Sequence, residues 1–202
     1  MIDYTLQQIV LRLLAMVFIA AVHGIAVAGT ACALGDPGPR YDGRLTANPF
    51  THLDLLGTLA GVFSVGWIRP IAVDPALLRF GRAGLVLVVL AGAAATLASV
   101  VVLRLARPHL LPLLPDTTSA LAFAVIETIG EVSIWFALVN VLPLPPLTGA
   151  HLIVALAPGA REGLRRVQPY VAVALAALAV TGLAARALAP VYAALAKVVL
   201  GE

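Results

Sequence analysis

The chain has 202 residues, of which 61% are hydrophobic and 11% are charged, and its formal net charge is +3. Ordinary soluble domains carry about 25% charged residues, so this composition excludes a soluble globular protein and predicts an integral membrane protein. The basic residues fall between the apolar stretches, where they act as topology signals, so we expect no nucleic-acid binding. The single cysteine, Cys32, cannot form an internal disulfide.

Four stretches are apolar enough to cross a bilayer, which takes about 20 residues. These stretches cover residues 9–34, 83–103, 120–142 and 171–188. A further helix is predicted at 189–200, where Pro190 stands near its start. The N-terminus lacks the basic start of a signal peptide, so the first stretch is predicted to be a retained span. We therefore predict an all-α polytopic membrane protein with four to five spans. It should form one membrane domain over 1–202, with a core at 9–160 and C-terminal helices at 168–200.

The segment 53–68 is apolar, but it is short and contains Asp54 and several glycines. Such a segment suits a re-entrant or interfacial position better than a full crossing. If it does not cross, most loop arginines fall on one side of the membrane, and Arg104 and Arg107 fall on the other. The positive-inside rule then predicts an external N-terminus and cytoplasmic arginine-rich loops in a bacterial inner membrane.

A proline-rich string, Asn140-Val-Leu-Pro-Leu-Pro-Pro-Leu-Thr-Gly149, follows the third apolar stretch. Pro143 and Pro145 would end a helix there, and the Asn140 amide could satisfy the backbone groups that are left free. A Gly-Asp-Pro turn stands far upstream, at 35–37. Between the turn and the proline-rich string stand five further short motifs: Gly43-Arg-Leu-Thr46, Asn48-Pro49, His52-Leu-Asp54, Gly57-Thr58 and Gly66-Trp67 through Pro70.

In this order, over about residues 15–160, the motifs resemble those of the site-2 protease family of intramembrane zinc metalloproteases. In that family, a His-Glu-x-x-His helix supplies two zinc ligands and the base, and an Asp before the last Gly supplies the third ligand. Counting back from the Gly-Asp-Pro turn places the helix motif at 23–27. His23 matches the first ligand, but Gly24 replaces the glutamate, Val27 the second histidine and Thr148 the aspartate.

The resemblance also places Thr96 where the family has a polar Asn in its next span. A catalytic zinc needs three protein ligands and a carboxylate that accepts the water proton. The sequence therefore predicts the family's fold with no metal, no cofactor and no protease activity. His23 is then expected to be a neutral imidazole bonded to a neighbouring polar group. The alternative is a rebuilt metal site in which His23 joins His151 and a carboxylate.

Two features indicate a role in binding other membrane proteins. Ala20, Gly24 and Ala28 form a stripe of small residues that would let a partner helix approach closely in lipid. Glu127 and Glu131 lie one helical turn apart within the third stretch, where carboxylates need a partner.

We therefore predict a structural or interaction subunit that lies in membrane lipid and binds partner transmembrane helices in a stable inner-membrane complex. The alternatives are an altered metal-dependent intramembrane protease and a subunit that binds a small molecule or cofactor.

Overall fold

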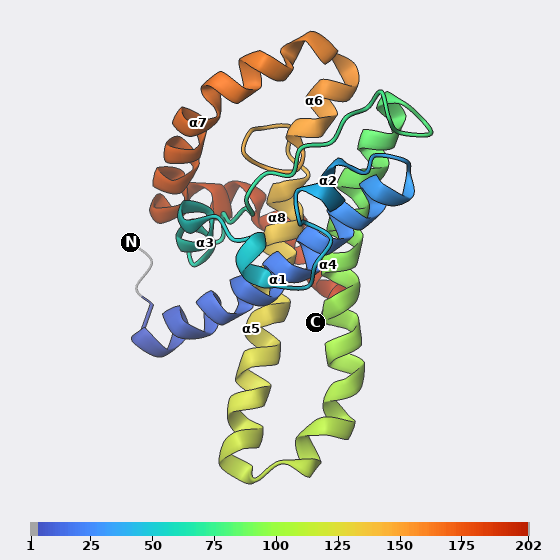
Figure 1. Ribbon diagram of the computed structural model, residues 1–202. Coiled ribbons are helices and arrows are strands. Elements are labelled where there is room, and N and C mark those ends of the chain that lie inside the picture. Colours follow the sequence, from blue (N-terminus) through green and yellow to red (C-terminus); the bar gives the residue numbers. More distant parts are fainter. Residues whose placement is uncertain (1–3, 202) are drawn as a thin grey trace.

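The computed structural model describes residues 4–201, and the regular structure in this range is helical (Figure 1). Within residues 4–201, three helices are long and apolar enough to span a membrane, namely α1 (Leu6–Ala33), α4 (Arg82–Leu110, continued by η2, Leu111–Leu113) and α5 (Asp116–Asn140). A fourth candidate span is the bent pair α7 (Arg161–Thr181) and α8 (Leu183–Val199). The prediction of an all-α polytopic membrane protein is confirmed.

Local sequence signals set the ends of these helices. Thr5 caps α1, and its side chain and that of Gln8 satisfy each other's backbone N–H groups in a capping box. Gly182 adopts a left-handed conformation with φ of 70° and separates α7 from α8, which diverge by 76°. The predicted span at 171–188 is interrupted, because the helix breaks inside it at Gly182, and Pro190 lies within α8.

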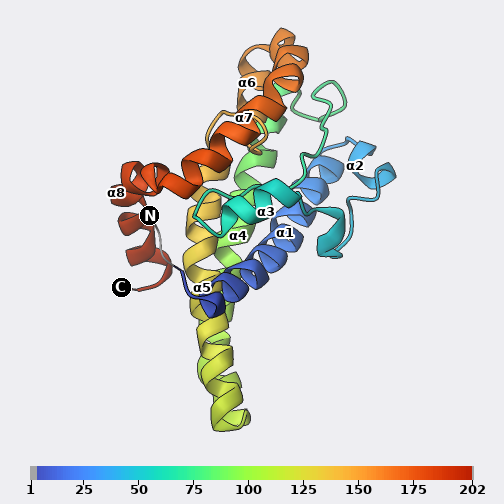
Figure 2. The same cartoon turned by 90° about the vertical axis from the view of Figure 1, so that its left-hand side faces the viewer.

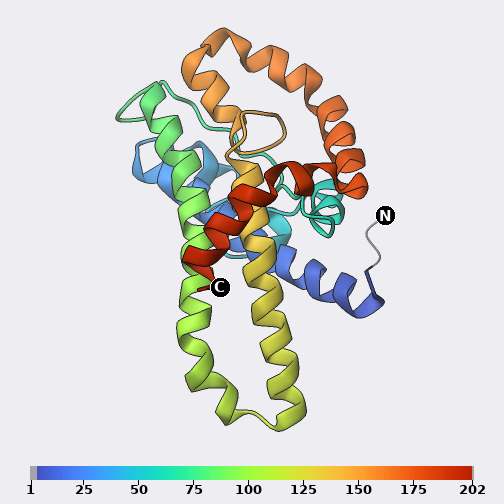
Figure 3. The same ribbon diagram turned by 180° about the vertical axis from the view of Figure 1, so that it is seen from behind.

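The tilted α1 crosses the antiparallel pair α4 and α5 and packs on both helices (Figures 1 and 2). Its inner face buries Met16, Ile19 and Val27, which join Leu85 of α4 and Phe136 of α5 in the main apolar core. On the far side, α8 lies across α4 and α5 (Figure 3). There Val100, Ile134, Ala196 and Leu200 form a separate apolar cluster.

The segment between α1 and α4 contains the short helices α2 (Gly38–Tyr41), η1 (Pro49–Thr51) and α3 (Leu55–Gly61) and then an extended run to α4. Leu53 and Ile68 form an isolated antiparallel bridge, so the two ends of 53–68 lie side by side. This is the geometry that a re-entrant segment requires. The extended run continues past Ile68 toward α6 (Ala150–Leu156) and η3 (Pro158–Ala160).

The connections are divided between two ends of the molecule. The α4–α5 connection lies at one end, whereas the loop before α4 and the α6–α7 connection lie toward the opposite end (Figures 1 and 3). The helical hairpin of α4 and α5 extends well beyond the other elements. The helix α4 continues through Leu110, beyond the predicted end of its apolar stretch at residue 103.

Candidate functional site

The helices α1 and α4 approach each other closely at Gly92. A Cβ atom at this position would lie 2.7 Å from both the His23 ring and the Val27 side chain, so glycine is required for this contact. One turn later, Thr96 reaches the same region of α1. The close approach therefore places a hydroxyl of α4 beside the imidazole of α1.

A chain of hydrogen bonds runs through the buried His23 ring. The Thr96 hydroxyl donates to the Gly92 carbonyl over 2.8 Å, and Thr96 Oγ1 lies 3.1 Å from His23 Nδ1. A hydroxyl has one proton, and Thr96 donates its own to Gly92. The proton between Thr96 Oγ1 and His23 Nδ1 therefore belongs to Nδ1, which donates to Thr96. The other ring nitrogen, Nε2, is then an acceptor in the neutral imidazole. It lies 2.9 Å from Thr148 Oγ1, which donates to it.

Thr148 reaches His23 because the chain folds back after α5. The Asn140 side-chain amide donates to the carbonyls of Gly66 and Phe136, and the Asn140 carbonyl accepts from the Gly149 N–H over 2.7 Å. Pro143 and Pro145 lie in the turn that these bonds close. Asn140 and Gly149 therefore hold position 148 against α1.

His52 occupies the space beside Gly24, where the family has a glutamate. A Cβ atom at Gly24 would overlap the His52 ring. His52 Nε2 donates to the Thr46 carbonyl over 2.9 Å, and burial lowers the pKa of His52, so Nδ1 is an unprotonated acceptor. This Nδ1 is buried and has no hydrogen-bond partner within residues 4–201.

These residues do not fit the three-ligand zinc of an intramembrane metalloprotease. Gly24 and Val27 offer no donor atom, and both ring nitrogens of His23 are bonded to hydroxyls. Among the residues that the structure describes, no three His, Cys, Asp or Glu side chains are grouped so as to hold a metal ion. The described residues therefore do not supply the three ligands that a catalytic zinc needs.

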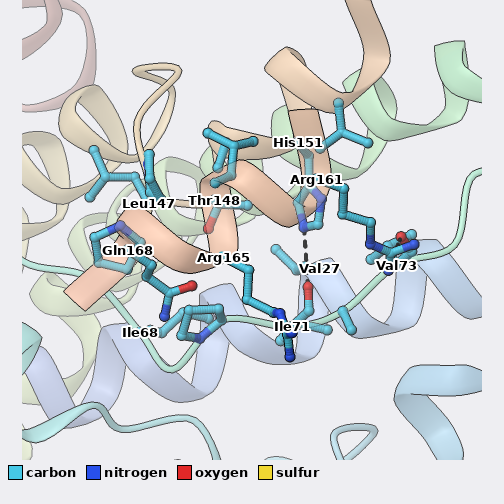
Figure 4. Close-up of a pocket in the computed structure, with 17 residues that line it drawn as sticks. Val27, Ile68, Ile71, Val73, Leu147, Thr148, His151, Arg161, Arg165 and Gln168 are labelled. Carbon is cyan, nitrogen blue, oxygen red and sulfur yellow. Dashed lines mark hydrogen bonds between the residues drawn. The ribbon is translucent and has the colours of Figure 1, made fainter. Parts of the chain in front are cut away.

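A cavity of about 230 Å³ opens beside Val27 and Thr148 (Figure 4). Its walls come from α1, the extended run at 68–73, the proline-rich turn, α6 and the start of α7. Most of the wall is apolar, and its polar side chains are Thr148, His151, Arg161, Arg165 and Gln168.

His151 is fixed to the extended run. Its Nε2 donates to the Ile71 carbonyl over 3.1 Å (Figure 4), and burial lowers the pKa of His151. Since Nε2 donates, Nδ1 is the acceptor nitrogen of the neutral ring. The alternative of a rebuilt metal site at His23 and His151 is not supported, because the described residues form no group of three potential metal ligands.

The small-residue stripe lies inside the molecule. Ala20, Gly24 and Ala28 are all buried, and Gly24 packs on the chain's own His52 ring. A partner helix cannot reach the stripe in this structure, which corrects its expected role. The stripe serves internal helix packing instead.

Glu127 and Glu131 have partners within the chain. Glu131 pairs with Arg12 over 2.9 Å, and Glu127 pairs with Arg104 and Arg107 of α4. Arg12 is only 4% exposed, and its Nε also donates to the Val62 carbonyl over 2.6 Å. The expectation that both carboxylates serve a partner protein is corrected, because the chain's own arginines already neutralise them.

The fold and the site define a multi-pass membrane protein that buries a histidine of its first span against a threonine of its proline-rich turn. A protein of Bacillus subtilis (strain 168) named "Putative zinc metalloprotease YwhC" is 32% identical over 196 residues, which cover 93% of this chain and 88% of the relative. No protein-family model and no solved structure matches the chain. The chain belongs to the site-2 protease family, which confirms the resemblance in the motifs.

This comparison overturns one prediction. The expectation that the chain is not an enzyme is wrong, because the relative that shows the family is named as a zinc metalloprotease and so points to a protease. The residues at positions 24, 27 and 148 change which donor atoms this one site offers. They do not show that the protein lacks activity.

Sequence reasoning assigned no role to two side chains of the site. Thr96 carried a signal, since it stands where the family has a polar residue in the following span, but its bond to His23 depends on the contact at Gly92. His52 carried a weaker signal, as part of a motif with no assigned role. Its position over Gly24 follows from the folding-back of the segment between α1 and α4.

Proposed function

We propose that the chain binds an extended apolar segment of another membrane protein in the cavity beside Thr148. The observation that carries this proposal is the backbone of Ile71 and Val73, which borders the cavity. The Ile71 carbonyl accepts from His151 and the Val73 carbonyl accepts from Arg161. The N–H groups of the same two residues donate to no group within residues 4–201.

An extended backbone with free donors favours the addition of a peptide strand, since main-chain hydrogen bonds supply affinity and pockets receive alternate side chains. The apolar wall formed by Ile68, Leu147 and Val154 suits Leu-, Ile- or Val-like side chains of such a segment. The cavity of about 230 Å³ admits side chains and excludes a folded domain. The partner is therefore a locally unwound transmembrane or juxtamembrane segment.

We place this binding in a stable complex of a bacterial inner membrane, with the arginine-rich loops on the cytoplasmic side. The surroundings support that placement, because Arg161 and Arg165 at the cavity would lie near anionic lipid headgroups. A second candidate function is hydrolysis of the bound segment, which the name of the YwhC relative favours. Capture of an apolar segment is the first step of both functions.

The test uses a photo-crosslinking residue at position 72, which is exposed and lines the cavity. Native membranes should give a discrete crosslinked band with one integral membrane protein. Position 121, which is exposed on α5 far from the cavity, serves as the matched control. The proposal fails if both positions give the same products, or if position 72 gives lipid adducts alone.

A further inference from the structure

The family is known for zinc chemistry, yet the described donor atoms do not fit zinc, and the hydroxyl of Thr148 stands at the aspartate position. We propose that Thr148 is the nucleophile of a metal-independent hydrolytic site, that His23 is its general base and that Thr96 is a positioning residue. This inference rests on the proposed function, since the bound apolar segment is the substrate whose peptide bond is cleaved.

The geometry meets the first requirement of nucleophilic catalysis. A nucleophile and its base must lie within about 2.6–3.2 Å, and a third group must orient the base. Thr148 Oγ1 lies 2.9 Å from His23 Nε2, and Thr96 Oγ1 lies 3.1 Å from His23 Nδ1. The three side chains come from three separate elements of the fold.

The tautomer meets the second requirement. Because the Thr96 hydroxyl donates to the Gly92 carbonyl, its oxygen accepts the proton of Nδ1 and leaves a lone pair on Nε2. That lone pair accepts the proton of Thr148. This bond polarises the hydroxyl of Thr148. Its oxygen, Oγ1, makes no other hydrogen bond within the described part of the chain.

Thr148 also lines the cavity, so its hydroxyl belongs to the wall that the bound segment contacts (Figure 4). Gln168 lines the same cavity and carries an amide N–H donor for a developing oxyanion. The neighbouring ring of Phe136 contacts His23 edge-on with centroids 5.0 Å apart, which restricts the orientation of the imidazole.

The reaction balances with water as the co-reactant. Thr148 Oγ1 bonds to the carbonyl carbon of the peptide while its proton moves to His23 Nε2. The carbon–nitrogen bond then breaks, and His23 returns that proton to the leaving amine, which leaves an ester on Thr148. Water attacks the ester, its proton passes through His23 to Thr148 Oγ1, and a carboxylic acid is released.

The experiment treats the purified full-length protein in mild detergent with a β-lactone probe in the presence of EDTA, followed by mass spectrometry of the adduct. We expect one adduct at Thr148. Thr148→Val and His23→Gln should reduce labelling at least tenfold, and Thr148→Ser should retain it. Thr96→Val should slow labelling and shift its pH profile. Thr128→Val is the matched control, because Thr128 makes a similar bond to a helix carbonyl away from the cavity.

The inference is overturned if folded wild-type protein gives no adduct at Thr148, or if the yield of the adduct does not depend on His23. Labelling that appears only when zinc is added would also overturn it. The probe reacts without a polypeptide partner, so its failure is distinguishable from a failure of segment binding at position 72. Thr148→Ser keeps the test decisive if His23→Gln does not fold.

Discussion

The imidazole ring of His52 lies against the Cα atom of Gly24, in the space that any larger side chain at position 24 would need. His52 is fully buried and is held from its other side by the Thr46 carbonyl, so the ring has little freedom to move away. The glycine at the family's glutamate position is therefore part of a packed contact between α1 and the segment that follows it.

Gly24→Ala should lower the free energy of unfolding by about 1–3 kcal/mol, the usual cost of forcing extra volume into a packed core. The measurement is thermal or denaturant unfolding of the protein in mild detergent. Gly29→Ala on the same helix is the control, because a Cβ there meets only Leu45 at 3.7 Å. It should be neutral or stabilising. His52→Ala should relieve the cost of Gly24→Ala in the double variant, and an additive double variant would contradict the contact.

The same contact explains how far the sequence could predict this structure. Hydropathy predicted the spans, and the spacing of the motifs located His23 and Thr148. The contact of His52 with Gly24 could not be predicted, because it depends on how the segment between α1 and α4 folds back. The partner of Glu131 was equally hidden, since Arg12 is 119 positions away in the chain.

That ion pair leads to the second prediction. Arg12 is buried between α1 and α5, its Nη1 donates to Glu131, and its Nη2 is buried without a partner within residues 4–201. Glu131→Gln should therefore lower the free energy of unfolding by about 1.5–3 kcal/mol, the range for a hydrogen bond to a charged group. Arg12→Met combined with Glu131→Gln should recover part of the loss, because no unpaired charge remains.

Glu162→Gln is the control for this cycle. Glu162 pairs with Arg165 and Arg166 on the exposed surface of α7, where ion pairs contribute little. Unfolding of this variant should match the wild type. If Glu131→Gln also matches the wild type, Glu131 does not neutralise Arg12 in the membrane.

The third prediction concerns pH. Burial lowers the pKa of His151 in the folded protein below its ordinary value of about 6.5. The unfolded chain therefore binds a proton first as the pH falls, so this contribution to stability is complete above about pH 6.5 and is lost below it. His52 has a shift of the same sign. The melting temperature should consequently fall between pH 7 and pH 5.

His151→Gln tests the assignment, since a glutamine amide can still donate to the Ile71 carbonyl but does not titrate over this range. The slope of melting temperature against pH should become shallower in this variant. Leu121→Ala, at an exposed position of α5 that does not titrate, is the control and should leave the slope unchanged. Equal slopes in the wild type and His151→Gln would contradict a neutral, half-buried His151.

The last prediction concerns membrane sidedness. Single cysteines at positions 40, 79 and 165, placed in a chain whose Cys32 is replaced by Ala, should all react with an impermeant maleimide from the cytoplasmic face. A cysteine at position 109 should react from the opposite face. The physical reason is that the segment 53–68 returns on itself through the bridge between Leu53 and Ile68, so the loops on either side of it share one face. All four positions are exposed. Of the four, Arg165 forms an ion pair with Glu162, and this pair lies on the surface of α7. Labelling is compared in intact spheroplasts and inverted vesicles. Reaction of positions 40 and 79 from different faces would mean that the segment crosses the membrane, whatever the outcome at position 109.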